Sequence, residues 1–411
     1  MSPDRRRLGR ARLGILSTFA LAGALCAVWT VRMPALKQKL DLTDAQLGLE
    51  VLGWGVGALI TMTIAGRIIG RHGSRNVLRF ALPGTAFCLA LVGLAPNYAL
   101  LIAAGLVFGL CFGLVDVAMN TQASTVERAY GRPLMGGMHA GWSLGAVAGG
   151  LVGAATAWLG FGFTGALCLF AVVGLPLTLA VGPLYLPESA RTSSAGHAES
   201  PRPRLPLLVY LFGALVFCSY LTEGSIADWS GVYLRDSLGS VETVAALGYP
   251  MFEASMFLGR MFADRLTTRL GARTLIMSAG VVAAAAFALV VFAPTPTLAL
   301  AGFALVGLGV CVVTPLAMSL AGAAGGADTE RAIAAASTFG YSGLLLGPVV
   351  IGFVSAATSM RIGYAVVIGV CVAIALSARF VPRGRHIEDR GNHGDAVERS
   401  GDPGVRCEVA V

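Results

Sequence analysis

Twelve stretches of about 20 mostly apolar residues run between Gly14 and Val381, and each ends in arginines or in a short polar turn. A bilayer core of roughly 30 Å takes about 20 helical residues to cross. Only helices and closed barrels satisfy their own backbone polar groups in lipid, and these runs lack the alternation of a barrel strand. The sequence therefore predicts an all-α membrane protein with 12 transmembrane helices.

The composition excludes an ordinary soluble domain. Hydrophobic residues make up 56% of the 411 residues and charged residues only 13%, about half the charged share of a typical soluble protein. The net charge of +8 does not indicate nucleic-acid binding, because the basic residues lie in short loops between apolar runs. The eight cysteines show no metal-ligand spacing, and the sequence contains no GxxxxGK[ST] loop. We therefore expect no metal, no cofactor, no nucleic-acid partner and no ATP hydrolysis.

The apolar runs fall into two sets of six, separated by a polar segment rich in Ser, Pro and Arg. The predicted spans lie near 14–34, 45–66, 77–95, 99–121, 135–159, 164–186, 206–228, 243–263, 273–293, 297–322, 332–356 and 361–381. The charged, glycine-containing tail is typical of disorder. The predicted organisation is an N-terminal six-helix bundle at 1–186, a linker at 187–205, a C-terminal six-helix bundle at 206–381 and a disordered tail at 382–411.

The basic residues predict the orientation in the membrane. With 12 spans, 25 Lys and Arg fall on the side of both termini and the linker, and five fall on the other side. Basic residues accumulate on the cytoplasmic side of membrane proteins. Both termini, the linker and the tail are therefore predicted to be cytoplasmic.

The two sets of runs repeat each other. Trp29 in the first run is mirrored by Trp229 in the seventh, 200 residues later. FGLCFGLVDVAMN at 108–120 corresponds to VGLGVCVVTPLAM at 306–318, and GWSLGAVAG at 141–149 corresponds to GYSGLLLGP at 340–348. Two like halves related by an axis along the membrane normal are the architecture of an alternating-access carrier, with the solute held between the halves.

Two arginine-rich loops resemble the signature of the major facilitator superfamily, which is Gly, three residues, Asp, Arg, any residue, Gly, any residue, and Arg or Lys. The loop after the second run carries this pattern with Gly70 at the place of the Asp, and its matching positions are Gly66, Arg71, Gly73 and Arg75. The loop after the eighth run carries a second copy with Gly259, Arg260, Asp264 and Arg265. The resemblance implies two pseudo-symmetric bundles and a conformational role for both loops.

The resemblance is closer to the fucose-permease-like branch of bacterial inner-membrane carriers, and it covers nearly the whole chain. Asp116-Val117-Ala118-Met119-Asn120 matches the branch's Glu-Thr-Ala-Ala-Asn, and the segment from His139 to Ala146 matches its Gln-Thr-Phe-Asn-Ser-Phe-Gly-Ala. The resemblance implies proton coupling at Asp116 and solute contact at His139. Thr30 stands where the branch has a carboxylate in the first span.

Ionisable groups within apolar spans are costly, so each is a functional candidate. Asp116 lies near the middle of the fourth run, and Asn120 lies one turn further on the same face. Glu223 lies in the seventh run, and Glu253 lies in the eighth with Tyr249 one turn before it. We predict proton coupling at the three acids and solute binding at Asn120 and Tyr249. The alternative is that these groups seal helix packing.

Other candidates for solute contact lie on the fifth run. His139 both donates and accepts hydrogen bonds, and Trp142 and Ser143 share its helical face. Trp29, Trp54 and Tyr341 offer rings that stack on a sugar or an aromatic solute, although single aromatic residues at helical spacing are more often packing residues.

Three further charges are predicted to form a gate. Arg32 and Glu50 fall near the outer ends of the first two runs, and Asp228 precedes Trp229 at the outer end of the seventh. Opposite charges on neighbouring spans favour an ion pair that closes the pathway on one side.

The sequence therefore predicts a monomeric, proton-coupled secondary transporter of a bacterial inner membrane, not an enzyme. Its partners are the lipid bilayer and a small polar solute, either sugar-like or an organic metabolite. Proton-antiport efflux of a drug or metabolite is the alternative, and a non-transporting receptor or scaffold is a more remote one.

Overall fold

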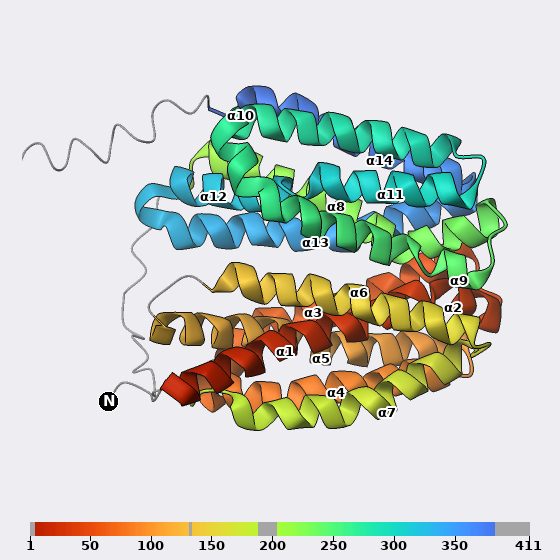
Figure 1. The fold of residues 1–411 in the computed structure, drawn as a ribbon, viewed down its shortest axis with the longest axis horizontal. Helices are drawn as coiled ribbons and strands as arrows, with labels where there is room; N and C mark the ends of the chain where they lie inside the picture. The colour runs from red at the N-terminus through yellow and green to blue at the C-terminus, as the bar shows by residue number, and fades with distance from the viewer. Residues whose placement is uncertain (1–4, 131–133, 188–203, 383–411) are drawn as a thin grey trace, which may run out of the picture.

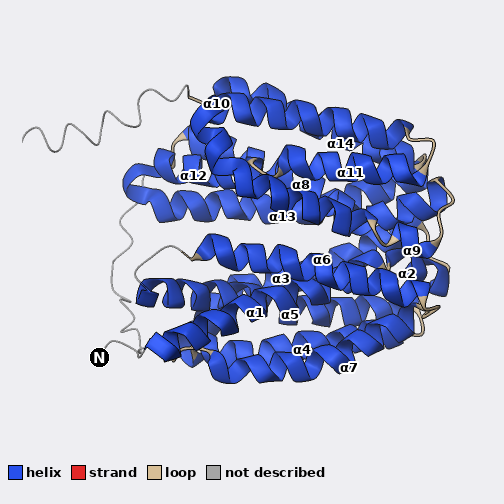
Figure 2. Ribbon diagram, viewed as in Figure 1, coloured by secondary structure: helices blue, strands red, loops and turns tan. Residues whose placement is uncertain are grey.

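The computed structural model describes residues 5–130, 134–187 and 204–382, and none of them lies in a strand (Figure 2). Long helices run side by side along one axis, with the N-terminus at one end of the bundle (Figure 1). The predicted linker lies almost entirely outside the described residues, and the predicted tail does so apart from residue 382.

The first half of the chain supplies six long helices. They are α1 (Arg5–Val31), α3 (Asp44–His72), α4 (Ser74–Leu94), α5 (Tyr98–Tyr130), α6 (Met135–Trp158) and α7 (Phe163–Val181). A short helix, α2 (Met33–Leu40), connects α1 to α3, and a single 3-10 turn, η1 (Gly182–Leu184), follows α7. Thr43 and Gln46 form a capping box that begins α3.

The second half repeats this pattern with two modifications. Its helices are α8 (Leu207–Val232), η2 (Tyr233–Ser237), α9 (Glu242–Ala245), α10 (Gly248–Phe292), α11 (Pro296–Val310), α12 (Val313–Gly325), η3 (Gly326–Asp328), α13 (Thr329–Ala357), α14 (Met360–Ser377) and η4 (Ala378–Phe380). The 45-residue α10 breaks at Gly271, whose φ of 73° and ψ of 154° are not helical, so it crosses twice. The segment from Pro296 to Gly325, made of α11 and α12, crosses once.

Eleven helical segments of the described chain are long and apolar enough to span a bilayer. The twelfth crossing is the part of α10 before Gly271, which carries Glu253 and Arg260 and is therefore less apolar. The predicted fold class is confirmed. Several helices run beyond their predicted spans, as α5 does in reaching Tyr130 rather than residue 121, because a helix does not end where the lipid core ends.

Glycines allow the helices of each half to approach closely. A Cβ on Gly145 of α6 would overlap the backbone of Ala20 in α1, and a Cβ on Gly343 of α13 would overlap the backbone of Phe217 in α8. These two glycines belong to the repeated segments 141–149 and 340–348. Small residues at such contacts are the usual means of packing helices in lipid. The repeat in the sequence therefore corresponds to equivalent packing in the two halves.

The two halves meet at the end of the bundle opposite the N-terminus, which we call the closed end. There Gly48 of α3 packs against Gly352 of α13, and Gly150 of α6 packs against Pro250 of α10. The other end, which we call the basic end, carries the start of α1 and the connection from α3 to α4 (Figure 1). Arg6, Arg10 and Arg75 lie around one pocket there.

Candidate functional site

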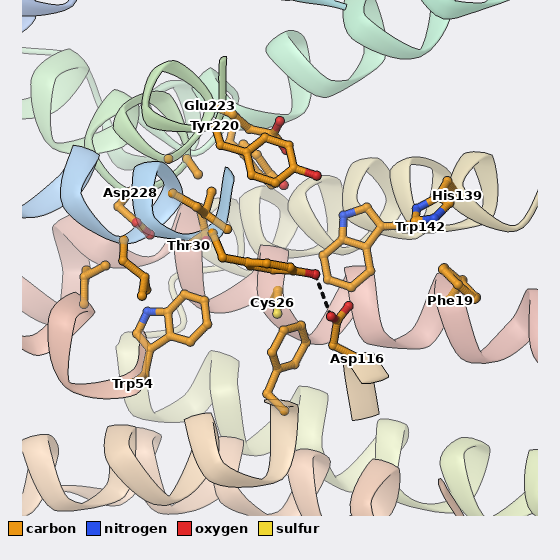
Figure 3. A pocket seen from close by; sticks show the side chains of 18 of the residues that line it. Phe19, Cys26, Thr30, Trp54, Asp116, His139, Trp142, Tyr220, Glu223 and Asp228 are labelled. Atoms are coloured by element: carbon orange, nitrogen blue, oxygen red, sulfur yellow. Dashed lines mark hydrogen bonds between the residues drawn. The ribbon is translucent and has the colours of Figure 1, made fainter. Parts of the chain in front are cut away.

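A chamber of about 190 Å³ lies between the two halves. It is lined from α1, α3, α5 and α6 on one side and from α8, α10 and α13 on the other (Figure 3). Its polar and aromatic lining residues are Phe19, Thr30, Trp54, Phe112, Asp116, His139, Trp142, Tyr220, Glu223, Asp228, Tyr249, Arg260 and Tyr341. Both halves contribute carboxylates, so a bound solute would contact charged groups on each side.

Asp116 forms a hydrogen bond that joins the two halves across the chamber. The hydroxyl of Tyr341 on α13 donates to Oδ2 of Asp116 on α5 at 2.6 Å (Figure 3). The ring of Tyr341 packs edge-to-face against Tyr220 of α8, with centroids 6.2 Å apart. Tyr220 thereby holds Tyr341 in place. Two residues predicted for different roles, Asp116 and Tyr341, are therefore direct partners.

The second half contributes both signs of charge to the chamber. Glu223 of α8 and Arg260 of α10 both line it. Glu253 is 1% exposed and lies behind the lining, where the hydroxyl of Tyr249 donates to its Oε1 at 3.0 Å. Glu253 is therefore buried beside the chamber without facing it.

Asp228 and His139 both line the chamber but have different surroundings. Asp228 is buried, and in the described part of the chain no hydrogen bond or ion pair joins its carboxylate to another residue. His139 packs edge-to-face against Phe19 of α1 at 5.2 Å. Trp142, one turn along α6, packs against Phe112. His139 and Trp142 both line the chamber, and their contact with a solute stays a prediction.

Three residues predicted to contact solute do not line the chamber, and two of them, Trp29 and Ser143, are buried elsewhere. Trp29 is 3% exposed and packs edge-to-face against Phe108 at 4.8 Å, because its side chain points toward α5 within the first half. Ser143 is 1% exposed and is not among the lining residues. Neither side chain reaches the chamber in this structure, so we correct both predictions and treat these residues as packing residues.

Asn120 lies in a crevice that adjoins the chamber. Its side-chain amide donates to the backbone carbonyl of Asp116 at 2.9 Å, so it does not orient the carboxylate. Asp116, Asn120, Ser124 and Arg128 line this crevice, which follows α5 toward the basic end. Asp116 therefore borders both the chamber and a path toward the basic end.

Ion pairs between the halves hold the closed end together. Arg32, whose side chain is fully buried, pairs with Glu242 of α9 at 2.9 Å and donates to the carbonyl of Phe161. Lys37 of α2 lies between Asp44 at 2.6 Å and Asp236 of the second half at 2.5 Å. Burial alone would lower the pKa of Lys37, but hydrogen bonds and charge from Asp236 and Asp44 raise it above its usual value.

The predicted ion pair between Arg32 and Glu50 does not form. Arg32 follows the end of α1 and faces α9, whereas Glu50 lies in the second turn of α3 and faces Gly105 of α5. Glu50 is fully buried, and neither of its oxygens has a hydrogen-bond partner in the described part of the chain. Asp228, predicted to belong to the same gate, lines the chamber instead.

The loop motif is explained by backbone geometry at its second glycine. Gly73 joins α3 to α4 with a φ of 79°, and Gly271 occupies the equivalent break in α10 with a φ of 73°. Glycine adopts positive φ without the steric cost of a Cβ. Gly66 and Arg71 are exposed at the end of α3, and Arg75 is in the first turn of α4.

In the second copy of the motif, Gly259 and Arg260 lie within α10 rather than in a loop. Gly259 packs against Cys311, and Arg260 lines the chamber. Arg265 is exposed on the same helix, and the side chain of Asp264 lies outside the described residues. The prediction missed Arg260, Tyr220 and Phe19 as chamber residues. Arg260 carried the necessary signal, a charge within an apolar run, but was assigned to the motif.

Comparison with known proteins matches the chain to one family. The model of the Major Facilitator Superfamily matches residues 15–239 and 212–400. An uncharacterized transporter, y4wD, of Sinorhizobium fredii is 37% identical over 88% of this chain and 96% of its own length. The membrane protein MosC of Rhizobium meliloti is 30% identical over 89% of each chain.

Solved structures share the fold at low sequence identity. A nucleoside transporter, NupG with the substitution D323A, superposes with a TM-score of 0.73 over 90% of this chain and 99% of its own, at 15% identity. A bacterial homologue of the lysosomal transporter Spinster superposes with a TM-score of 0.67 over 92% of this chain and 98% of its own, at 14% identity.

Proposed function

The chain belongs to the major facilitator superfamily and is a membrane transporter, and we propose that it moves a small polar solute by proton-coupled alternating access. The observation that carries this proposal is the hydrogen bond from Tyr341 to Asp116 across the chamber. Because Asp116 contacts both halves, its affinity for a proton depends on how the two halves are placed relative to each other. The proposal is a secondary transporter of a bacterial inner membrane that works as a monomer.

The coupling step follows from the strength of that hydrogen bond. A hydrogen bond to an ionised carboxylate is roughly twice as strong as one between neutral groups. A proton on Asp116 therefore weakens the contact between α5 and α13, and its loss strengthens the contact again. A proton that binds one arrangement of the halves better than the other shifts the population toward that arrangement.

The accessible side of the site is proposed from the two ends of the bundle. Because most of the 30 basic residues fall, by sequence, on the side of the termini, we assign the basic end to the cytoplasm. The crevice at Asn120 and Ser124 leads from Asp116 toward this end, and ion pairs hold the opposite end together. The arrangement corresponds to a carrier open to the cytoplasm.

Two candidate classes of transported solute are each supported by a different observation. The fucose-permease-like resemblance, including His139 in the chamber, favours uptake of a sugar-like solute or organic metabolite. A second candidate is efflux of a drug or metabolite in exchange for protons. The abundance of aromatic rings and carboxylates in the chamber favours this second candidate.

The test uses purified protein in liposomes with an imposed pH gradient. The vesicles are exposed to a mixture of small metabolites, and mass spectrometry measures which solutes accumulate or are expelled. Wild type should move at least one solute in proportion to the gradient, and Asp116→Asn should abolish that movement while the protein stays folded. Asp41→Asn, which removes an exposed acid at the closed end, is the control. Undiminished gradient-driven movement by Asp116→Asn would refute the proposal.

A further inference from the structure

The chamber contains more negative than positive charge. Its described lining holds three carboxylates, Asp116, Glu223 and Asp228, and one guanidinium, Arg260. A fourth acid, Glu253, is buried behind the lining. One guanidinium does not neutralise four acids, and an unpaired buried carboxylate is costly. The site therefore has less positive than negative charge, and a bound solute or bound protons must supply the difference.

Asp228 is the carboxylate best placed to receive a cation. Asp116 already accepts a hydrogen bond from Tyr341, and Glu223 lines the same chamber as the cationic Arg260. The side chain of Asp228 is 6% exposed and lines the chamber, and no hydrogen bond or ion pair joins it to another described residue. Figure 3 shows Asp228, Thr30 and Trp54 toward one end of the chamber, with His139 and Phe19 toward the other.

The rest of the lining suits a flat apolar ring that carries a positive charge. Aromatic faces attract cations and stack on flat rings. Seven Phe, Trp and Tyr side chains belong to the described lining, and Trp54, Trp142, Tyr220 and Tyr341 are among them.

We propose that the transported solute is an organic cation, an ammonium group carried on an aromatic or other flat apolar ring. The ammonium group donates to Asp228, and the ring lies among the aromatic side chains near Trp54. A space of about 190 Å³ accommodates a ring of this kind with a short side chain. This inference rests on the proposed transport function and names its substrate class.

The test is equilibrium binding by calorimetry to the purified full chain in detergent. The probes are three matched series built on benzyl, 2-phenylethyl and 2-(indol-3-yl)ethyl groups, and each series carries an amine, a hydroxyl or a carboxylate. In at least one series the amine should bind about tenfold or more tighter than its alcohol, as expected for a hydrogen bond to a charged group. Asp228→Asn should remove that advantage, whereas Asp41→Asn should leave the affinities for both the amine and the alcohol unchanged.

The outcomes separate this inference from the transport proposal. If no amine in any series binds more tightly than its alcohol and its acid, the inference is overturned, and this result needs no variant. Amine selectivity that survives in Asp228→Asn overturns the assignment to Asp228. Binding is measured without a gradient, so a failure of proton-driven transport leaves the result intact. Gradient-driven transport of a solute without amine selectivity would overturn only the substrate class.

Discussion

The substitution Glu242→Gln tests the ion pairs that hold the closed end. Arg32 has a fully buried side chain, and Glu242 is its carboxylate partner at 2.9 Å. Removing one member of a buried pair costs about 3–5 kcal/mol, because a charge is left unpaired. Glu242 keeps 22% side-chain exposure, and Arg32 keeps the carbonyl of Phe161, which reduces the cost. We expect the substitution to favour opening of this end by a free energy of about 2 kcal/mol, which is about a thirtyfold shift in the equilibrium between closed and open.

The assay is the distance between spin labels at the closed end, measured in a background without native cysteines. Ala99 of α5 and Thr297 of α11 are exposed near this end and belong to different halves. Glu242→Gln should add or enlarge a population with a longer distance between the two labels. Asp41→Asn removes an exposed acid from the same end and should leave the distances unchanged. An unchanged distance distribution in Glu242→Gln would show that this ion pair does not hold the halves together.

Two further predictions concern packing and pH. Gly145→Ala should destabilise the protein by about 1–3 kcal/mol, because its Cβ overlaps the backbone of Ala20, whereas Gly137→Ala on the same helix meets nothing within 4 Å and should be neutral or slightly stabilising. Thermal unfolding in detergent measures both, and equal melting temperatures would contradict the packing account. Because the pKa of Lys37 is raised in the folded protein, its stabilising contribution is fully present below about pH 10.4 and is lost as the pH rises through the higher folded value. As the pH rises above about 10.4, the melting temperature of wild type should therefore fall more than that of Lys37→Met. Melting temperatures that fall equally with pH in the two proteins would contradict this prediction.

The fold was predictable because it depends on length and apolarity, which are local properties of the sequence. Each apolar run is long enough to cross a bilayer, and few other structures satisfy such a chain in lipid. Asp116 was predictable as a site residue for a related reason, since a carboxylate in an apolar run needs a partner or a function. Its partner Tyr341 lies 225 positions away, and only the packing of the two halves brings the pair together.

The gate was not predictable, because its partners depend on connections rather than on spans. Arg32 and Glu50 lie at neighbouring span ends, but the direction in which each side chain points depends on helix rotation. The short helix α9 that supplies Glu242 lies at the start of a predicted span, where no pattern distinguished it. Arg260 was assigned to the loop motif because the sequence does not show which glycine ends the helix. The helix breaks at Gly271, where φ is positive, and Arg260 lies well before that break.

The most direct test of the central claim measures protons and solute together. Liposomes that contain the protein and a pH-sensitive dye are supplied with a solute that the protein moves, with no gradient imposed. Proton-coupled alternating access predicts that the internal pH changes as solute crosses, and that Asp116→Asn exchanges solute without moving protons. Solute movement through the wild-type protein with no accompanying change of internal pH would contradict the account.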